Sequence, residues 1–188
     1  MTKGSDYSSA TFAEFYDHLD VYVNRGDVDF FVSEALAARG PVLELGCGTG
    51  RVLLPCARAG APIWGLDSSE AMLARCRQKL AAEPEEVRKH VVLRQGDMRD
   101  FRFDTEFRLV TIPFRPFQHL AAVEEQLACL ASIHRALGDG GRLILDVFNP
   151  SLEILVDKSR FDEHPSGEPF TLPDGRIVER TERVTGRD

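Results

Sequence analysis

The sequence predicts an α/β fold whose doubly wound, mainly parallel sheet is covered by helices on both faces. The main observation is a set of short apolar runs, at 41–45, 61–67, 90–97, 107–113 and 141–150. Between most of these runs, apolar residues recur at helical spacing. Strands that alternate with helices indicate βαβ units, in which the sheet is buried on both sides.

The composition fits one globular domain of 188 residues, with 43% hydrophobic residues and a net charge of −7. This charge argues against a nucleic-acid partner, because phosphate binding needs a basic face. The four cysteines form no C-x-x-C pair and no histidine lies at ligand spacing, so we expect neither a metal site nor disulfides. No apolar run approaches the ~20 residues of a membrane span. We therefore expect a cytoplasmic protein without a membrane partner.

The segments around the strands are expected to be helical. Residues 11–38 predict an N-terminal helical region with a break at 24–27, and a further helix is expected over 69–82. The longest helix is expected over 121–137, with the glycines of 138–141 capping its C-terminal end. Its predicted apolar face consists of Val123, Leu127, Leu130, Ile133, His134 and Leu137.

These patterns divide the chain into three parts. Residues 1–40 form an N-terminal helical cap, 41–150 the ligand-binding core, and 151–188 a polar extension. The extension contains a turn signal, LPDGR, between two strand candidates at 168–172 and 176–184. We expect it to form a β-hairpin over a substrate site.

The stretch VLELGCGTG, residues 42–50, places a glycine at every second position after a strand. Glycines at a strand-to-helix turn let a ligand approach the backbone, at the sheet edge where ligands bind in open α/β folds. The spacing G-x-G-x-G differs from the dinucleotide pattern G-x-G-x-x-G, because position 51 is arginine. Glu44 adds a negative charge that favours an ammonium group over a pyrophosphate. The alternative is a structural tight turn.

Two more strand ends carry acids. Asp67 ends the second run, where a carboxylate can accept both hydroxyls of a ribose. The alternative is an acid at a helix N-terminus, although Ser68 and Ser69 already supply cap candidates. Asp97 and Met98 end the third run and could hold an adenine amino group and ring, or form an ordinary turn.

Together these motifs resemble class I S-adenosylmethionine-dependent methyltransferases that act on small molecules. ELGCGTGRVLLP resembles the first motif of that family, GLDSSEAMLARCRQKL the second and QGDMRDF the third. IPFRPFQHL resembles the segment after the fourth strand and GRLILDVFNP the fifth strand. The resemblance covers roughly residues 10–150 and implies a Rossmann-like fold.

The resemblance also implies that the cofactor is S-adenosyl-L-methionine, with its methionine part on the glycine loop, and that no metal is required. We therefore expect the cofactor to bind at Glu44, Gly46, Cys47, Gly48, Gly50, Asp67, Ser68, Met72, Asp97, Met98, Pro113 and Tyr16.

The expected function is methyl transfer to a nitrogen or oxygen of a small molecule by in-line displacement. The alternatives are a cofactor-binding protein without turnover and, less favoured, an NAD(P)-dependent oxidoreductase. A hydroxyl acceptor benefits from a general base, for which His119 is the first candidate and His18 the second; either could instead be a surface residue. Tyr16 and Tyr22 either close over the cofactor or pack the N-terminal helix. Arg115 either pairs with an acidic substrate or is a solvated surface residue.

One departure from the family concerns the end of the sheet. The full family fold has seven strands, of which the last two form an antiparallel hairpin, and the sequence after residue 150 does not supply them convincingly. We therefore expect either a truncated chain or a sheet completed by a partner. An exposed edge strand would favour a homodimer.

Overall fold

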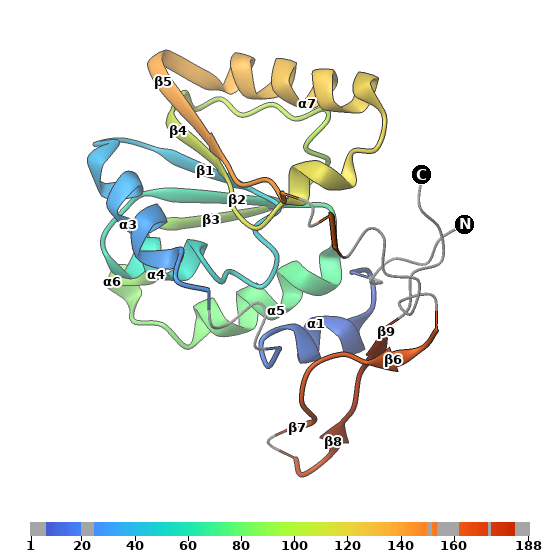
Figure 1. The fold of residues 1–188 in the computed structure, drawn as a ribbon. Helices are drawn as coiled ribbons and strands as arrows, with labels where there is room; N and C mark the ends of the chain where they lie inside the picture. The colour runs from blue at the N-terminus through green and yellow to red at the C-terminus, as the bar shows by residue number, and fades with distance from the viewer. Residues whose placement is uncertain (1–6, 20–24, 150–151, 154–161, 173, 183–188) are drawn as a thin grey trace.

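The computed structural model describes residues 7–19, 25–149, 152–153, 162–172 and 174–182 (Figure 1). Among these residues, no helix is both long and apolar enough to cross a lipid bilayer. Tyr22 lies outside the described residues, so its expected place over the cofactor stays a prediction.

The core is a five-stranded parallel sheet in the order β3-β2-β1-β4-β5 (Figure 1). This order and direction confirm the predicted doubly wound α/β fold. Since the chain first moves outward from β1 to β3 and then returns to β4, the strand order reverses between β1 and β4, which is where open sheets bind ligands. The strands are β1 Val42–Leu45, β2 Ile63–Asp67, β3 Val91–Gln95, β4 Phe107–Ile112 and β5 Leu137–Leu145.

The strand register brings the carboxyl ends of the strands to one edge of the sheet. Leu45 is paired with Leu66, and Asp67, the last residue of β2, is paired with Gln95, the last residue of β3. The segments that follow β1, β2 and β3 therefore begin side by side, as the positions of the three predicted motifs require.

Helices cover both faces of the sheet (Figure 1). Alternate strand residues point to opposite faces, so Val42 and Leu43 enter different apolar clusters. The cluster with Val42 also holds residues of α3, α4 and α5, whereas the cluster with Leu43 holds residues of α7. The helices are α1 Ala10–Tyr16, α3 Val28–Ala37, α4 Leu53–Arg58, α5 Glu70–Ala81, α6 Glu85–Arg88, the 3-10 helix η1 Pro116–His119, and α7 Val123–Ala136.

The predicted apolar face of α7 is wrong in most of its positions. Val123, Leu127 and Leu130 are 62%, 60% and 38% exposed, whereas Ile133 is buried as predicted. The buried stripe is instead made by Cys129, Ser132, Ile133 and Ala136. Helical periodicity shows which residues share a face, but the position of the helix on the sheet decides which face is covered.

The glycines of 138–141 do not cap α7. β5 starts at Leu137, directly after the helix, and Leu137 pairs with Phe107. The next pair is Leu109 with Arg142, so residues 138–141 form an irregularity inside the strand. Gly140 takes a backbone φ of 71°, which suits this bend.

The C-terminal extension contains the predicted antiparallel turn. β7 (Phe170–Thr171) pairs with β8 (Ile177–Val178), and β6 (His164–Pro165) pairs with β9 (Thr181–Glu182). Phe170 contacts Phe15 with ring centroids 6.4 Å apart, and Arg176 forms an ion pair of 2.9 Å with Glu14, so this hairpin contacts α1 (Figure 1). Its expected position over a substrate stays a prediction.

β5 is an edge strand in the part of the chain that the structure describes, because its sheet pairing there is with β4 alone. An open edge of this kind offers unpaired backbone groups to another chain. The homodimer that we expect from the sequence therefore stays a prediction.

Candidate functional site

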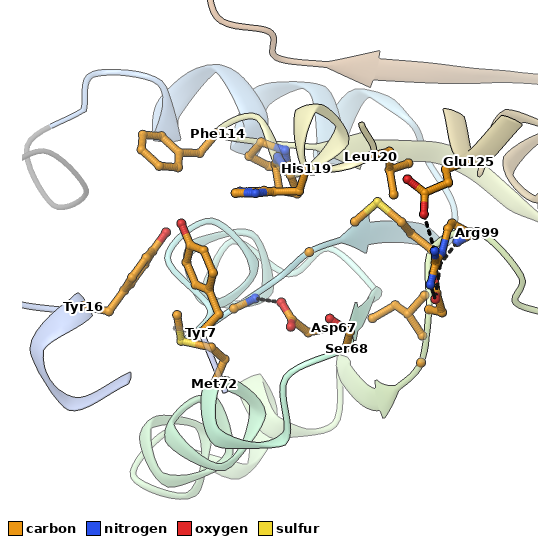
Figure 2. Close-up of a pocket in the computed structure, with 18 residues that line it drawn as sticks. Tyr7, Tyr16, Asp67, Ser68, Met72, Arg99, Phe114, His119, Leu120 and Glu125 are labelled. Atoms are coloured by element: carbon orange, nitrogen blue, oxygen red, sulfur yellow. Dashed lines mark hydrogen bonds and ion pairs between the residues drawn. The ribbon is translucent and has the colours of Figure 1, made fainter. Parts of the chain in front are cut away.

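A cavity of about 440 Å³ lies where the carboxyl ends of β1 to β4 meet the N-terminal segment (Figure 2). This volume lies in the range of small-molecule sites. Its walls come from the segments that follow four strands, together with the start of the chain. The lining residues are Tyr7, Tyr16, Gly46, Gly48, Leu66, Asp67, Ser68, Met72, Gly96, Asp97, Met98, Arg99, Pro113, Phe114, Pro116, His119, Leu120 and Glu125.

The three glycines of the loop have different tasks, although all have a positive backbone φ of 54° to 84°. A Cβ atom at Gly46 would lie 2.6 Å from Pro116, and one at Gly50 would lie 2.7 Å from the sulfur of Cys76. Both glycines therefore make room for side chains of the protein itself. A Cβ atom at Gly48 would meet nothing within 4 Å, and Gly48 lines the cavity. Gly48 is thus the glycine whose missing side chain leaves space for a ligand.

Asp67 ties this loop to the next one. Its Oδ2 accepts a hydrogen bond of 2.7 Å from the Gly48 amide, and its Oδ1 accepts one of 2.8 Å from the Ser69 amide. Burial raises the pKa of Asp67, and the backbone donors oppose that rise. Each oxygen keeps a further lone pair, so the carboxylate is fixed in position and can still accept from a ligand.

Ser69 carries out the capping that the sequence predicts. Its side chain accepts from the Met72 amide at 3.1 Å, and its hydroxyl donates to the Tyr7 carbonyl oxygen. Because Ser69 is the N-cap of α5, Asp67 is not needed for that role. The hydrogen bond to residue 7 also fixes the start of the described chain beside the cavity.

The carboxylate of Asp97 also lines the cavity and is bound by Arg99. The Arg99 guanidinium donates to both oxygens, at 2.5 to 3.0 Å, and also to Glu125 of α7 (Figure 2). These hydrogen bonds hold the pKa of Asp97 below its usual value. A ligand that contacts Asp97 would therefore meet an ionised carboxylate whose geometry is already fixed.

Glu44 and Cys47 are buried but do not line the cavity. Glu44 is 3% exposed, and burial raises its pKa to about 8, with nearby Arg51 acting in the opposite direction. Its Oε2 atom has no hydrogen-bond partner among the described residues. Burial also raises the pKa of the Cys47 thiol. A buried carboxyl oxygen without a hydrogen-bond partner is costly, which makes Glu44 a candidate for an interaction that a ligand would supply.

Four rings form an aromatic end of the cavity: Tyr7, Tyr16, Phe114 and His119. Figure 2 shows the two phenol oxygens pointing toward the space beneath Phe114 and His119. The ring centroids of Tyr7 and His119 are 5.5 Å apart, in an edge-to-face arrangement. Such rings can exclude water from a reacting group and favour a cation.

Asp17 holds the helix that carries Tyr16. Its carboxylate accepts from the Thr49 hydroxyl at 2.6 Å, and from Arg75 and Lys79 of α5 at 3.0 and 2.9 Å. The end of α1 is therefore joined to the glycine loop and to α5, which keeps Tyr16 over the cavity. By contrast, His18 stacks on Phe170 of the hairpin and does not line the cavity.

The structure thus brings most of the predicted site residues to one cavity. Of the predicted cofactor residues, Glu44, Cys47 and Gly50 do not line it, and neither do the further candidates His18 and Arg115. The prediction missed Tyr7, Arg99, Phe114 and Glu125, of which Arg99 and Phe114 lie next to predicted motif residues and could have been found there. Tyr7 and Glu125 come from distant segments, and no sequence spacing relates them to the strand ends.

A family model described as a methyltransferase domain matches residues 42–141, from the start of β1 into β5. The chain belongs to this methyltransferase domain family. The match covers β1 to β4, the start of β5 and all three predicted cofactor motifs, and it agrees with the parallel strand order.

Among curated relatives of this methyltransferase domain is dTDP-3-amino-3,4,6-trideoxy-alpha-D-glucopyranose N,N-dimethyltransferase of Streptomyces venezuelae. It is 32% identical over 142 residues, which cover 69% of this chain and 56% of that protein. The chain spans about half the length of the first curated relatives that it matches, from 42% to 56%.

Solved structures are similar over most of the methyltransferase domain. S-adenosylmethionine-bound CalS10, an amino pentose methyltransferase from Micromonospora echinaspora, has a TM-score of 0.68 at 27% identity and covers 96% of this chain and 70% of that one. The glycopeptide N-methyltransferase MtfA, complexed with S-adenosylmethionine, has a TM-score of 0.56 at 30% identity, with coverage of 81% and 66%. S-adenosylmethionine is the cofactor used by this family.

The residues of this chain fit that cofactor chemically. The open space at Gly48 would admit a ligand against the backbone, and the fixed Asp67 carboxylate can accept from vicinal hydroxyls. The unpartnered Oε2 of Glu44 is a suitable acceptor for an ammonium group near the loop. The described residues contain no cluster of three His, Cys, Asp or Glu side chains arranged to bind a metal.

Proposed function

We propose that this chain transfers a methyl group from S-adenosylmethionine to a nitrogen or oxygen atom of a small molecule by in-line displacement. The observation that carries the proposal is the position of Asp67, whose carboxylate is fixed by the Gly48 and Ser69 amides at the wall of the cavity. This arrangement supports a bound adenosyl group, because one carboxylate can accept from both ribose hydroxyls while its own geometry is held by the backbone.

When bound, S-adenosylmethionine supplies a methyl group on a positively charged sulfur, which is open to attack by a nucleophile. The residues that would hold it are Gly48 at the methionine part, Asp67 at the ribose, and Asp97 with Met98 at the adenine. Met72, which is buried and lines the cavity, would pack against the adenosyl group. Glu44 would interact with the ammonium group from within β1.

The aromatic end of the cavity would hold the methyl acceptor. Methyl transfer needs alignment of the two reactants and exclusion of water, and Tyr7, Tyr16 and Phe114 offer walls for both purposes. A nitrogen acceptor is favoured, because the named relatives include an N,N-dimethyltransferase and a glycopeptide N-methyltransferase. A neutral amine needs no base for the displacement, whereas a hydroxyl acceptor would use His119.

Calorimetry with S-adenosylmethionine, S-adenosylhomocysteine and NAD tests the cofactor. We expect saturable binding of the two adenosyl compounds and no heat with NAD. A folded protein that binds neither adenosyl compound would overturn the proposal, and one that prefers NAD would restore the oxidoreductase hypothesis.

A transfer assay with methyl-labelled cofactor tests turnover. dTDP-amino sugars are the first acceptors to try, because the relative from Streptomyces venezuelae is named for one. Asp67→Ala is the matched negative control, since it removes a proposed cofactor contact. Cofactor binding without transfer to any amine or hydroxyl acceptor would support the alternative of a binding protein without turnover.

A further inference from the structure

Phe114 and Arg115 follow β4 in an unusual backbone conformation. Their φ angles are 60° and 71°, in the left-handed region that residues other than glycine rarely adopt. Phe114 lines the cavity, and Arg115 leads directly into η1, which carries His119. This conformation persists only where surrounding contacts hold it, so the side-chain contacts of Arg115 are informative.

The guanidinium of Arg115 lies over two aromatic rings. Its central carbon is 4.7 Å from the ring centroid of Phe114 and 5.1 Å from that of Phe148. Gln118 holds Phe148 in turn, because its side-chain oxygen accepts from the Phe148 amide at 2.5 Å. Segments that follow β4 and β5 therefore position one guanidinium, and stacking on rings leaves the N–H edges of that group available.

The arginines around the Phe114 ring outnumber the carboxylates that pair with them, which leaves an excess of positive charge there. The guanidinium carbons of Arg25 and Arg51 also lie near the ring of Phe114, at 4.7 and 5.9 Å from its centroid. Arg51 pairs with Asp27 at 2.6 Å, and Arg25 pairs with Asp27 at 3.2 Å and with Asp146 at 2.8 Å. Within the described residues, Arg115 is the member of this group that has no carboxylate partner.

We propose that Arg115 recognises the substrate by binding an anionic group, a carboxylate or a phosphate, on the methyl acceptor. The inference rests on the proposed function, because the acceptor would occupy the aromatic end of the cavity while its anionic group reaches Arg115. A planar guanidinium donates two parallel hydrogen bonds to the oxygens of either group. In a chain of net charge −7, a local positive excess also directs an anion to this point.

Calorimetry with simple anions tests this inference on the full chain loaded with S-adenosylhomocysteine. The probes are inorganic pyrophosphate, inorganic phosphate and acetate, and the ranking of their affinities distinguishes a phosphate from a carboxylate ligand. The variants are Arg115→Gln, which removes the charge, and Arg115→Lys, which keeps the charge without the planar fork. Arg88→Gln is the matched control, because Arg88 precedes β3 and so lies at the other edge of the sheet.

We expect saturable anion binding that Arg115→Gln weakens on the order of ten- to a hundredfold, the loss of a charge-assisted hydrogen bond. Arg115→Lys should be intermediate and Arg88→Gln unchanged. Phe148→Leu, which removes one of the two stacked rings, should weaken binding less than Arg115→Gln does, and it tests the site without altering the strained position.

Equal anion affinity in Arg115→Gln and the parent protein would overturn the inference, as would the absence of saturable binding for every probe. Titration with S-adenosylhomocysteine in the same samples separates this failure from failure of the proposed function. A protein that binds the adenosyl compound but no anion keeps the proposed function and loses Arg115 as a recognition residue. If no adenosyl compound binds, the anion titrations are made on the unloaded chain and are judged by the same comparison of variants.

Discussion

The Gly48 amide donates a hydrogen bond of 2.7 Å to Oδ2 of Asp67, and this contact joins the loops that follow the adjacent strands β1 and β2. A second bond, from the Ser69 amide to Oδ1, fixes the other carboxylate oxygen. Two backbone donors offset part of the cost of burying the acid. The same carboxylate therefore organises the cavity wall and presents acceptor sites to it.

Replacing Asp67 should weaken cofactor binding. Asp67→Ala removes the proposed ribose acceptor and leaves two amides without their partner, so we expect a loss of about 1–3 kcal/mol in binding free energy. Asp67→Asn should lose less, because its single oxygen can still accept one of these bonds. Calorimetry with S-adenosylhomocysteine measures both losses.

Asp139→Ala is the control for this pair, because Asp139 lies in the irregular segment at the start of β5, at the far edge of the sheet. It should bind S-adenosylhomocysteine like the parent protein. An unchanged affinity in Asp67→Ala would show that the ribose binds elsewhere.

Gly48 and Gly50 should respond differently to the same substitution. Both have positive φ, so alanine at either position carries a shared conformational cost of about 1–2 kcal/mol. At Gly50 the new methyl group would also overlap Cys76, which adds about 1–3 kcal/mol of overpacking. At Gly48 the methyl group enters open space at the cavity wall.

We therefore expect Gly50→Ala to lose more unfolding free energy than Gly48→Ala, and expect Gly48→Ala to lose cofactor affinity. Urea denaturation and calorimetry measure the two effects, and Gly48→Val should bind still more weakly because its side chain is larger. If both Gly48 variants bind the cofactor as tightly as the parent protein does, the cofactor does not approach the backbone at Gly48.

The buried Glu44 should make the fold less stable as the pH rises. Its pKa is about 8 in the folded protein and near its ordinary 4.5 in the unfolded chain, so between these values the folded state binds the extra proton. Unfolding free energy should therefore fall by up to about 1.4 kcal/mol per pH unit across this window. Glu44→Gln does not titrate, so its stability relative to the parent should increase from pH 5.5 to pH 8. Urea denaturation at both pH values checks this; a constant difference would contradict the raised pKa.

Cofactor binding at pH 7 should release a proton from Glu44. An ammonium group beside a protonated acid favours its ionised form, so the pKa of Glu44 should fall on binding. Calorimetry of S-adenosylhomocysteine in buffers with different ionisation heats counts released protons. Glu44→Gln should release fewer protons than the parent protein; an equal count would remove Glu44 from the proposed ammonium site.

His119 distinguishes the two classes of acceptor. With a hydroxyl acceptor, His119→Ala should lower kcat by about 10²- to 10⁴-fold, the usual contribution of a general base. With an amine acceptor, the loss should stay below about tenfold. The control is His18→Ala, which removes a ring that stacks on Phe170 outside the cavity and should leave kcat unchanged. A large loss with an amine substrate would assign His119 a role beyond that of a base for hydroxyls.

The sequence predicted the fold well because its signals are local. Apolar runs bounded by glycines and acids located all five parallel strands, and Ser69 marked the start of α5. The glycine loop, Asp67 and Asp97 all occur at strand ends, so strand prediction alone was sufficient to bring them to one edge of the sheet. The expected face of α7 failed at Leu127, because periodicity does not show which side of a helix the sheet covers.

The sequence by itself determined the parallel sheet, the loop at 46–50 and the acids at the next two strand ends, since each depends on neighbouring residues. Only the tertiary structure decided that Gly46 and Gly50 accommodate protein side chains while Gly48 faces a cavity. It also decided that Asp97 is held by Arg99, and that Arg115 stacks on Phe114 and Phe148. The contacts of Arg99 with Glu125 and of Arg115 with Phe148 join residues that are far apart along the chain, because the packing of separate strands and helices brings them together.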